Sequence, residues 1–113
     1  MKVVYIAGKF RGANAWEIEK NIRWAEQYGM EVAERGAMPL IPHSNTRFFH
    51  GTLSDTFWLD GTLELLRRCD AVYCVRGWQE STGARMEVAE AERLGKPVFE
   101  FIGDVAKWIA ETP

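Results

Sequence analysis

The sequence predicts an α/β fold: one sheet of four parallel strands, with the expected order 2-1-3-4 and helices on both faces. Short, β-branched apolar runs alternate along the chain with longer segments whose apolar residues recur at helical spacing. This alternation is typical of a parallel sheet, because each crossover helix must pack on one face of the sheet or the other. The expected architecture is a small three-layer sandwich of the Rossmann-like or flavodoxin-like type.

The first half of the chain is expected to hold two strands around a long helix. Gly8 ends the first apolar run. The helix has the capping pair Asn14 and Glu17 at its start and Gly36 after its end. Prolines limit the pairing of the second strand. The expected elements are a strand at 3–7, a helix from 14 to about 35, a strand at 37–42 and a polar, turn-rich segment at 43–55.

The second half repeats the alternation. A helix with leucines on one face precedes an apolar strand, and the next helix is stopped by Gly95 and Pro97. The expected elements are a helix at 56–68, a strand at 70–75, a loop at 76–81, a helix at 82–94, a strand at 98–102 and a helix at 104–111.

Length, composition and charge indicate how many domains the chain forms and which partners it is not expected to bind. A chain of 113 residues, 47% of them hydrophobic, fits one globular domain, expected to span 1–113. With 14 basic and 16 acidic residues and no block of like charge, the chain is not expected to bind polymeric nucleic acid or a membrane. The short apolar start is interpreted as a strand and not as a signal peptide, so we expect a cytoplasmic protein.

The cysteines and histidines predict neither a disulfide nor a metal site. Cys69 and Cys74 bracket a predicted strand, which holds them too far apart for a disulfide, so both are expected to be reduced thiols. Two cysteines and two histidines without metal-ligand spacing do not indicate zinc. His43 and His50 are interpreted as surface or hydrogen-bonding residues, and no cofactor is expected.

A ligand is expected beyond the carboxyl ends of the strands, where the strand order reverses. In the predicted order, this crevice lies between the loops at 8–14 and 76–81. The first loop carries Lys9 and Arg11, which suit a phosphate or carboxylate but can equally be solvated surface cations. It lacks the GxGxxG and GxxxxGK[ST] patterns of dinucleotide folds and P-loops.

Glu87 is the strongest candidate for chemistry. On a helical wheel it falls on the apolar face, between Ala91 and Leu94, whereas the other charged residues of that helix fall outside this face. Burying a charge costs several kcal/mol unless it is compensated, so a carboxylate placed in this way is a candidate functional group. The alternative is a carboxylate at the rim that pairs with an arginine or caps the backbone.

Four other residues near the crevice are also candidates for the site. Ser81 and Gly83 begin the helix of Glu87 and suit an anion, although Ser81 can also be a plain N-cap. Tyr5 can be a core residue or extend its hydroxyl into the crevice. The position of Trp78 on a loop favours a role in recognition, in which its ring stacks on a base or sugar.

Together these segments resemble one known family. The resemblance rests on Tyr5-Ile6-Ala7-Gly8, Cys69-Asp70-Ala71-Val72-Tyr73 and residues 77–87, followed by Ala91 and Gly95-Lys96-Pro97. They look like the nucleoside 2-deoxyribosyltransferase superfamily, and most like its small, phage-rich branch called domain of unknown function 4406. The chain is also similar to the 2′-deoxynucleoside 5′-phosphate N-hydrolases. The resemblance covers nearly the whole chain, and residues 69–91 are its specific part.

The resemblance implies chemistry at an N-glycosidic bond. The family motif Ser-x-Gly-x-x-x-Glu runs here from Ser81 to Glu87, and its glutamate attacks C1′ of the sugar and displaces the base. Water or a second base then releases the covalent glycosyl-enzyme. Tyr5 matches a tyrosine that positions the nucleophile. The loop at 8–12 matches one that binds the sugar or a 5′-phosphate, and Ser81 matches a phosphate-binding serine.

The chain departs from the family at the acid that assists the leaving base. That position holds Thr62, and the flanking carboxylates Asp60 and Glu64 are the residues that can substitute, of which we expect Asp60. Asn45 is expected to face the crevice. The expected catalytic residues are Glu87, Tyr5 and Asp60, and the expected substrate-binding residues are Gly8, Lys9, Phe10, Arg11, Asn45, Asp70, Trp78, Ser81 and Gly83.

Three interpretations of the function follow. The first is an enzyme that cleaves or transfers the N-glycosidic bond of a (deoxy)nucleoside or its 5′-monophosphate. The second is a nucleotide-binding or sensing module without turnover, which the departure at Thr62 favours. A third interpretation is an interaction protein, which five tryptophans in a small domain weakly favour. The expected partner is a small nucleoside or nucleotide, and the resemblance implies a homodimer or larger homo-oligomer.

Overall fold

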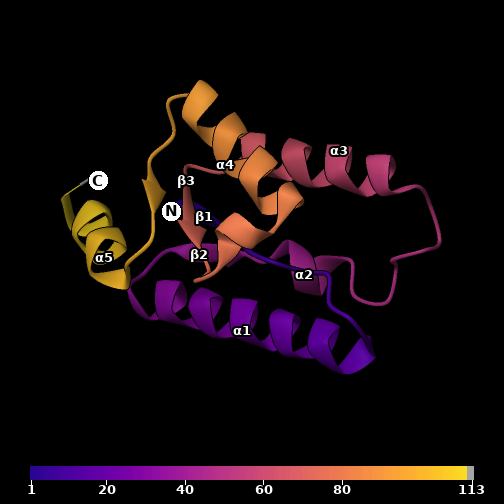
Figure 1. The fold of residues 1–113 in the computed structure, drawn as a ribbon. Helices are drawn as coiled ribbons and strands as arrows, with labels where there is room; N and C mark the ends of the chain where they lie inside the picture. The colour runs from indigo at the N-terminus through magenta and orange to yellow at the C-terminus, as the bar shows by residue number, and fades with distance from the viewer. Residues whose placement is uncertain (112–113) are drawn as a thin grey trace.

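The computed structural model describes residues 1–111 and contains the predicted sheet, with four parallel strands in the order β2-β1-β3-β4 (Figure 1). The strands are β1 (Val3–Ala7), β2 (Met38–Leu40), β3 (Ala71–Cys74) and β4 (Val98–Phe99). The helices are α1 (Ala15–Glu34), α2 (Pro42–Asn45), α3 (Asp55–Arg67), the 3-10 helix η1 (Trp78–Glu80), α4 (Thr82–Arg93) and α5 (Ile102–Glu111).

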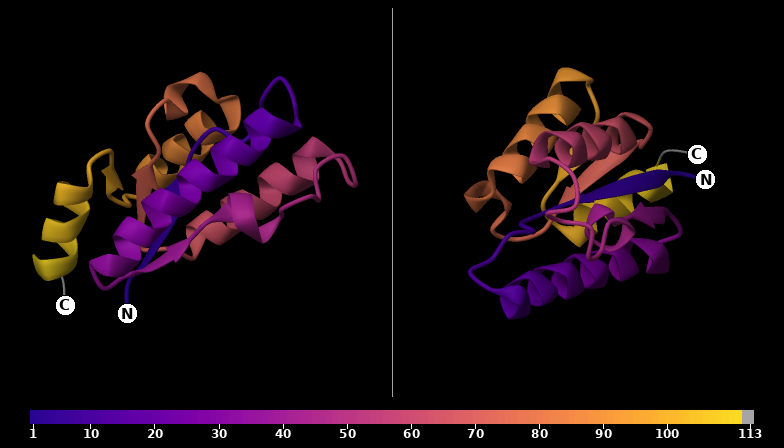
Figure 2. Two further views of the ribbon diagram at one scale, coloured as in Figure 1. Left: turned by 90° about the horizontal axis from the view of Figure 1, so that it is seen from below. Right: turned by 90° about the vertical axis from the view of Figure 1, so that its right-hand side faces the viewer.

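Helices cover both faces of the sheet, as predicted. Successive side chains of a strand point to opposite faces, so β1 contributes Val4 and Ile6 to one core and Tyr5 and Ala7 to the other. The first core packs against α1 and α5, and the second against α3 and α4. Figures 1 and 2 show α1 on one side of the strands and α3 with α4 on the other.

The predicted capping pair begins α1. The Asn14 side chain accepts a hydrogen bond from the Glu17 N–H at 2.9 Å, and the Glu17 carboxylate accepts one from the Ala13 N–H at 2.7 Å. After the last turn, Gly36 has a φ of +95°, which few other residues adopt. The sequence signals for both ends of this helix are therefore confirmed.

The structure corrects two expected segments. The strand expected at 37–42 ends at Leu40, and Pro42 starts α2, because a proline has no N–H for a ladder and fits the first turn of a helix. The strand expected at 98–102 ends at Phe99. Ile102 belongs to α5 because it lies three residues before the fully buried Val105, on the helical face that packs on the sheet.

The state of the two cysteines and the absence of a membrane-spanning segment were also predicted from the sequence. Cys69 and Cys74 are free, buried thiols, as expected, and burial raises their pKa values to about 11 and about 12. Among residues 1–111, none of the helices combines the length and apolar character needed to cross a bilayer.

The loop after β1 passes very close to the end of β3. A Cβ atom on Gly8 would lie 2.8 Å from the Cβ of Val75 and 2.9 Å from its Cγ2. Valine is stiff at χ1 and cannot turn away, so only glycine allows this approach. The two loops that follow β1 and β3 are held together at this point.

We predict that Gly8→Ala lowers the free energy of unfolding by about 1–3 kcal/mol through this clash. Gly61→Ala is the matched control, because Gly61 lies within α3 and a Cβ atom there meets nothing within 4 Å. Alanine at that position should raise the free energy of unfolding by about 0.5–1 kcal/mol. Urea denaturation measures both changes, and a Gly8→Ala protein as stable as the parent would contradict the assignment.

Candidate active site

A cleft of about 870 Å³ lies beyond the carboxyl ends of β1 and β3, where the strand order reverses. Its walls come from five segments: the loop after β1, the start of α1 with Ile18, the region around α2, the first half of α3, and the η1–α4 junction. These segments gather at the right of Figure 1, the end toward which β1 runs. The cleft thus lies where the sequence predicted a ligand.

Glu87 lies on the wall of this cleft and is only 7% exposed. Its carboxylate Oε2 accepts a short hydrogen bond from the hydroxyl of Tyr5, whose side chain is fully buried in β1. The bond joins residues 82 positions apart, so the fold is what brings them together. Glu87 is therefore held by a neutral donor, and not by the arginine that a rim carboxylate would need.

Burial changes the protonation of both partners. It raises the pKa of Glu87 from 4.5 to about 7, against the hydrogen bond of the Tyr5 hydroxyl, which lowers it. Burial first, and then the charge of Glu87, raise the pKa of Tyr5 well above 10. At neutral pH Tyr5 is a fixed donor, and Glu87 exchanges between its acid and carboxylate forms.

His43 holds the loop after β1 in place. Its Nε2 lies 3.2 Å from both the Gly8 and the Lys9 carbonyl oxygens, and because these oxygens only accept, Nε2 carries the proton. Burial lowers the pKa of His43, so the ring is neutral at pH 7. Phe10, from the same loop, lies against the rings of His43 and His50. No motif in the sequence marked His43 as a site residue, and its place directly after a short strand was the signal that could have found it.

Two ion pairs span the mouth of the cleft. Lys9 Nζ lies 3.5 Å from Glu80 of η1, and Arg11 Nη2 lies 2.6 Å from Asp55 at the start of α3. Both expected cations thus line the cleft, and each has a carboxylate partner on the facing wall. All four side chains are well exposed, so each pair contributes little to stability.

The start of α4 forms another part of the wall. Ser81 is the N-cap, and its hydroxyl accepts a hydrogen bond from the Ala84 N–H at 3.1 Å. A Cβ atom on Gly83 would meet only the Ser81 Oγ at 3.9 Å, so the backbone at Gly83 is open. Ser81 and Gly83 both line the cleft. The N-cap role of Ser81 is established, and it leaves room for a ligand beside Gly83.

One face of α3 completes the site, but Asp60 is not on it. The lining residues of this helix are at positions 55, 56, 58, 59 and 62, and all except 56 recur at the spacing of a single helical face. Asp60 lies off this face and is exposed, so the structure does not bring it to Glu87. Thr62 lines the cleft instead. The helical spacing of positions 55, 58, 59 and 62 in the sequence could have excluded Asp60. The same spacing could have identified Trp58, which lines the cleft.

Asn45 and Asp70 also lie outside the cleft. Asn45 is exposed at the end of α2. Asp70 immediately precedes β3, so it lies at the amino end of the sheet, and its carboxylate accepts a hydrogen bond from the Val3 N–H at 2.8 Å. That bond ties the starts of two strands together. Asp70 therefore stabilises the amino edge of the sheet and lies far from the cleft at the carboxyl ends of the strands.

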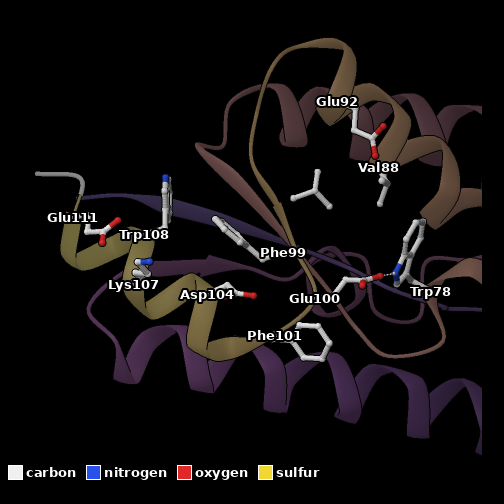
Figure 3. Close-up of a pocket in the computed structure, with 11 residues that line it drawn as sticks. Trp78, Val88, Glu92, Phe99, Glu100, Phe101, Asp104, Lys107, Trp108 and Glu111 are labelled. Atoms are coloured by element: carbon white, nitrogen blue, oxygen red, sulfur yellow. Dashed lines mark hydrogen bonds between the residues drawn. The ribbon is translucent and has the colours of Figure 1, made fainter.

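Trp78 belongs to a second cavity, of about 620 Å³, between α4 and α5 (Figure 3). Its indole Nε1 donates a hydrogen bond to Glu100 at 2.8 Å, and Val88, Phe99 and Trp108 also line this cavity. Trp78 is not among the residues that line the cleft of Glu87. Its ring packs on the core beside α4, which is why it points away from the predicted crevice.

We also searched the described residues for groups of side chains that could bind a metal ion. Within the described range of the chain, no group of three or more His, Cys, Asp or Glu side chains is placed to hold a metal ion. The expectation of a site without metal or cofactor stays a prediction.

Comparison with known proteins gives a family and a fold. A family model described as domain of unknown function DUF7768 matches residues 2–101. No curated protein matches the chain. A solved structure of a 2-deoxyribosyltransferase from the psychrotolerant bacterium Bacillus psychrosaccharolyticus matches with a TM-score of 0.64 and 22% identity, over 92% of this chain and 90% of that chain. The two proteins share a fold, whereas the resemblances to domain of unknown function 4406 and to the N-hydrolases stay predictions.

The raised pKa of Glu87 predicts how stability depends on pH. Between the unfolded value of 4.5 and the folded value of about 7, the folded chain keeps a proton that the unfolded chain releases. The contribution of Glu87 to stability is therefore greatest below pH 4.5 and is lost as the pH rises through 7. Relative to the parent, Glu87→Gln should gain up to about 3 kcal/mol between pH 4.5 and pH 8. Urea denaturation across this range measures the difference, and a difference that does not change with pH would contradict the burial of this carboxyl.

Proposed function

For this chain, which belongs to the family described as domain of unknown function DUF7768, we propose cleavage or transfer at the N-glycosidic bond of a (deoxy)nucleoside or its 5′-monophosphate. Glu87 is the proposed nucleophile and Tyr5 positions it. The single observation that carries the proposal is the buried carboxylate of Glu87 on the wall of the cleft, bonded to a tyrosine hydroxyl.

The geometry suits a nucleophile. Tyr5 donates to Oε2, which leaves Oε1 of Glu87 for an attack on C1′. The attack forms a C1′–O bond and breaks the bond from C1′ to the base, and the base leaves with that electron pair and takes a proton from water. Water or a second base then attacks C1′, and the carboxylate of Glu87 is regenerated. Because Tyr5 is buried and cannot turn away, it keeps the carboxylate aimed throughout.

Independent support comes from the fold and the motif. The matched structure is described as a 2-deoxyribosyltransferase, and it covers nearly the whole of this chain. The resemblance of residues 81–87 to the Ser-x-Gly-x-x-x-Glu motif points to the same chemistry, and the residues of that motif Ser81, Gly83 and Glu87 all line one cleft.

A binding module without turnover is the second candidate, and the position of Thr62 favours it. Thr62 lines the cleft where the family acid is expected, and its hydroxyl donates to the Leu59 carbonyl at 3.0 Å. A hydroxyl cannot give up a proton to a leaving base as a carboxylic acid does. This candidate predicts saturable nucleotide binding in calorimetry without release of free base.

We predict that Glu87→Gln slows base release by at least about a thousandfold, since it removes the nucleophile and keeps the shape of the side chain. The assay incubates the protein with a panel of deoxynucleosides and their 5′-monophosphates and detects free base by chromatography. Glu92→Gln is the control, because Glu92 lies on the same helix and lines the second cavity. Equal turnover by parent and Glu87→Gln, or none by either, would overturn the proposed chemistry.

The protonation of Glu87 predicts the pH profile. Only the carboxylate attacks, so kcat/KM should fall as the pH drops below about 7. Tyr5→Phe removes a hydrogen bond that lowers the pKa of Glu87, so the acidic limb should move to higher pH and kcat/KM at pH 6 should drop about tenfold. A profile whose acidic limb does not move in Tyr5→Phe would show that another group titrates.

A further inference from the structure

The charges around the cleft bear on which substrate it takes. The lining holds two cations, Lys9 and Arg11, and three carboxylates, Asp55, Glu80 and Glu87. Each cation already faces a carboxylate from the opposite wall, at 3.5 Å for Lys9 and Glu80 and at 2.6 Å for Arg11 and Asp55. The described lining therefore offers an anion no cation that lacks a carboxylate neighbour.

The third cation near the mouth is committed elsewhere. Arg85, in the first turn of α4, donates to the Gln79 carbonyl oxygen and to the Thr82 hydroxyl, and it is not part of the cleft wall. The N-cap hydroxyl of Ser81 already accepts from Ala84. What remains beside Gly83 is open backbone, whose N–H groups can donate to a sugar hydroxyl as well as to an anion.

A nucleoside and its 5′-monophosphate differ mainly in charge, because the phosphate carries nearly two negative charges at pH 7. The two ion pairs are exposed and weak, so a phosphate can take a cation from its partner. The displaced carboxylate, however, stays at the mouth and repels the phosphate. An uncharged nucleoside meets no such repulsion.

We propose that Asp55 and Glu80 make this cleft selective for an uncharged nucleoside over the corresponding 5′-monophosphate. The proposal rests on the proposed function and narrows its substrate class. Asp55 and Glu80 are specificity residues in it: each neutralises a cation that would otherwise hold a phosphate.

The test compares kcat/KM and the calorimetric dissociation constant for one deoxynucleoside and its 5′-monophosphate at low salt. The parent should favour the nucleoside by about tenfold or more. The double variant Asp55→Asn with Glu80→Gln frees both cations and should shift the ratio toward the monophosphate by about tenfold or more, less so at high salt, where exposed charges are screened.

Asp104→Asn with Glu92→Gln is the control, since it changes the net charge equally at the second cavity and should leave the ratio unchanged. A parent that prefers the monophosphate, or a double variant with the parental ratio, overturns the selectivity. Absence of base release from both compounds overturns the proposed reaction, while the dissociation constants still report the selectivity. Binding of neither compound overturns the selectivity as well.

Discussion

The hydrogen bond between Tyr5 and Glu87 is the interaction on which the site depends. A carboxyl group is placed among apolar residues, where its ionised form is costly, and one buried hydroxyl offsets part of that cost. The result is a group that exchanges its proton near neutral pH and faces a cleft. An acid that titrates near 7 is well suited to act as a nucleophile, because it is available without being strongly stabilised in its ionised form.

The strand order of the sheet brings Tyr5 and Glu87 together. β1 and β3 are neighbours, so the loop after β1 and the η1–α4 junction meet at the same edge, with Gly8 packed against Val75. Tyr5 points to the face that α4 covers, and α4 presents Glu87 nearly two turns after its N-cap. His43 then holds the loop beside the cleft, and the two exposed ion pairs lie across its mouth. The position of Glu87 is thus a consequence of topology as much as of its own helix.

The sequence predicted the fold and the centre of the site because both follow from apolar periodicity. Glu87 stood out on the wheel of its helix, and the cap of α1 was readable from Asn14 and Glu17. The periphery was less predictable: Asp60 and Asn45 face solvent, and Asp70 lies at the opposite edge of the sheet. The partners of Lys9 and Arg11 come from distant segments, so only the folded chain shows them. The predictions of one domain, a cytoplasmic location and a homo-oligomer remain predictions.

The most direct test of the central claim is mass spectrometry of the protein after incubation with a 2′-fluoro-2′-deoxynucleoside. An electron-withdrawing fluorine slows the breakdown of a glycosyl ester, so a covalent intermediate accumulates. The account predicts that the protein gains the mass of one fluorodeoxyribosyl group and that the modified peptide carries it on Glu87. A group attached to a different residue, or base release with Glu87 unmodified, would contradict the account.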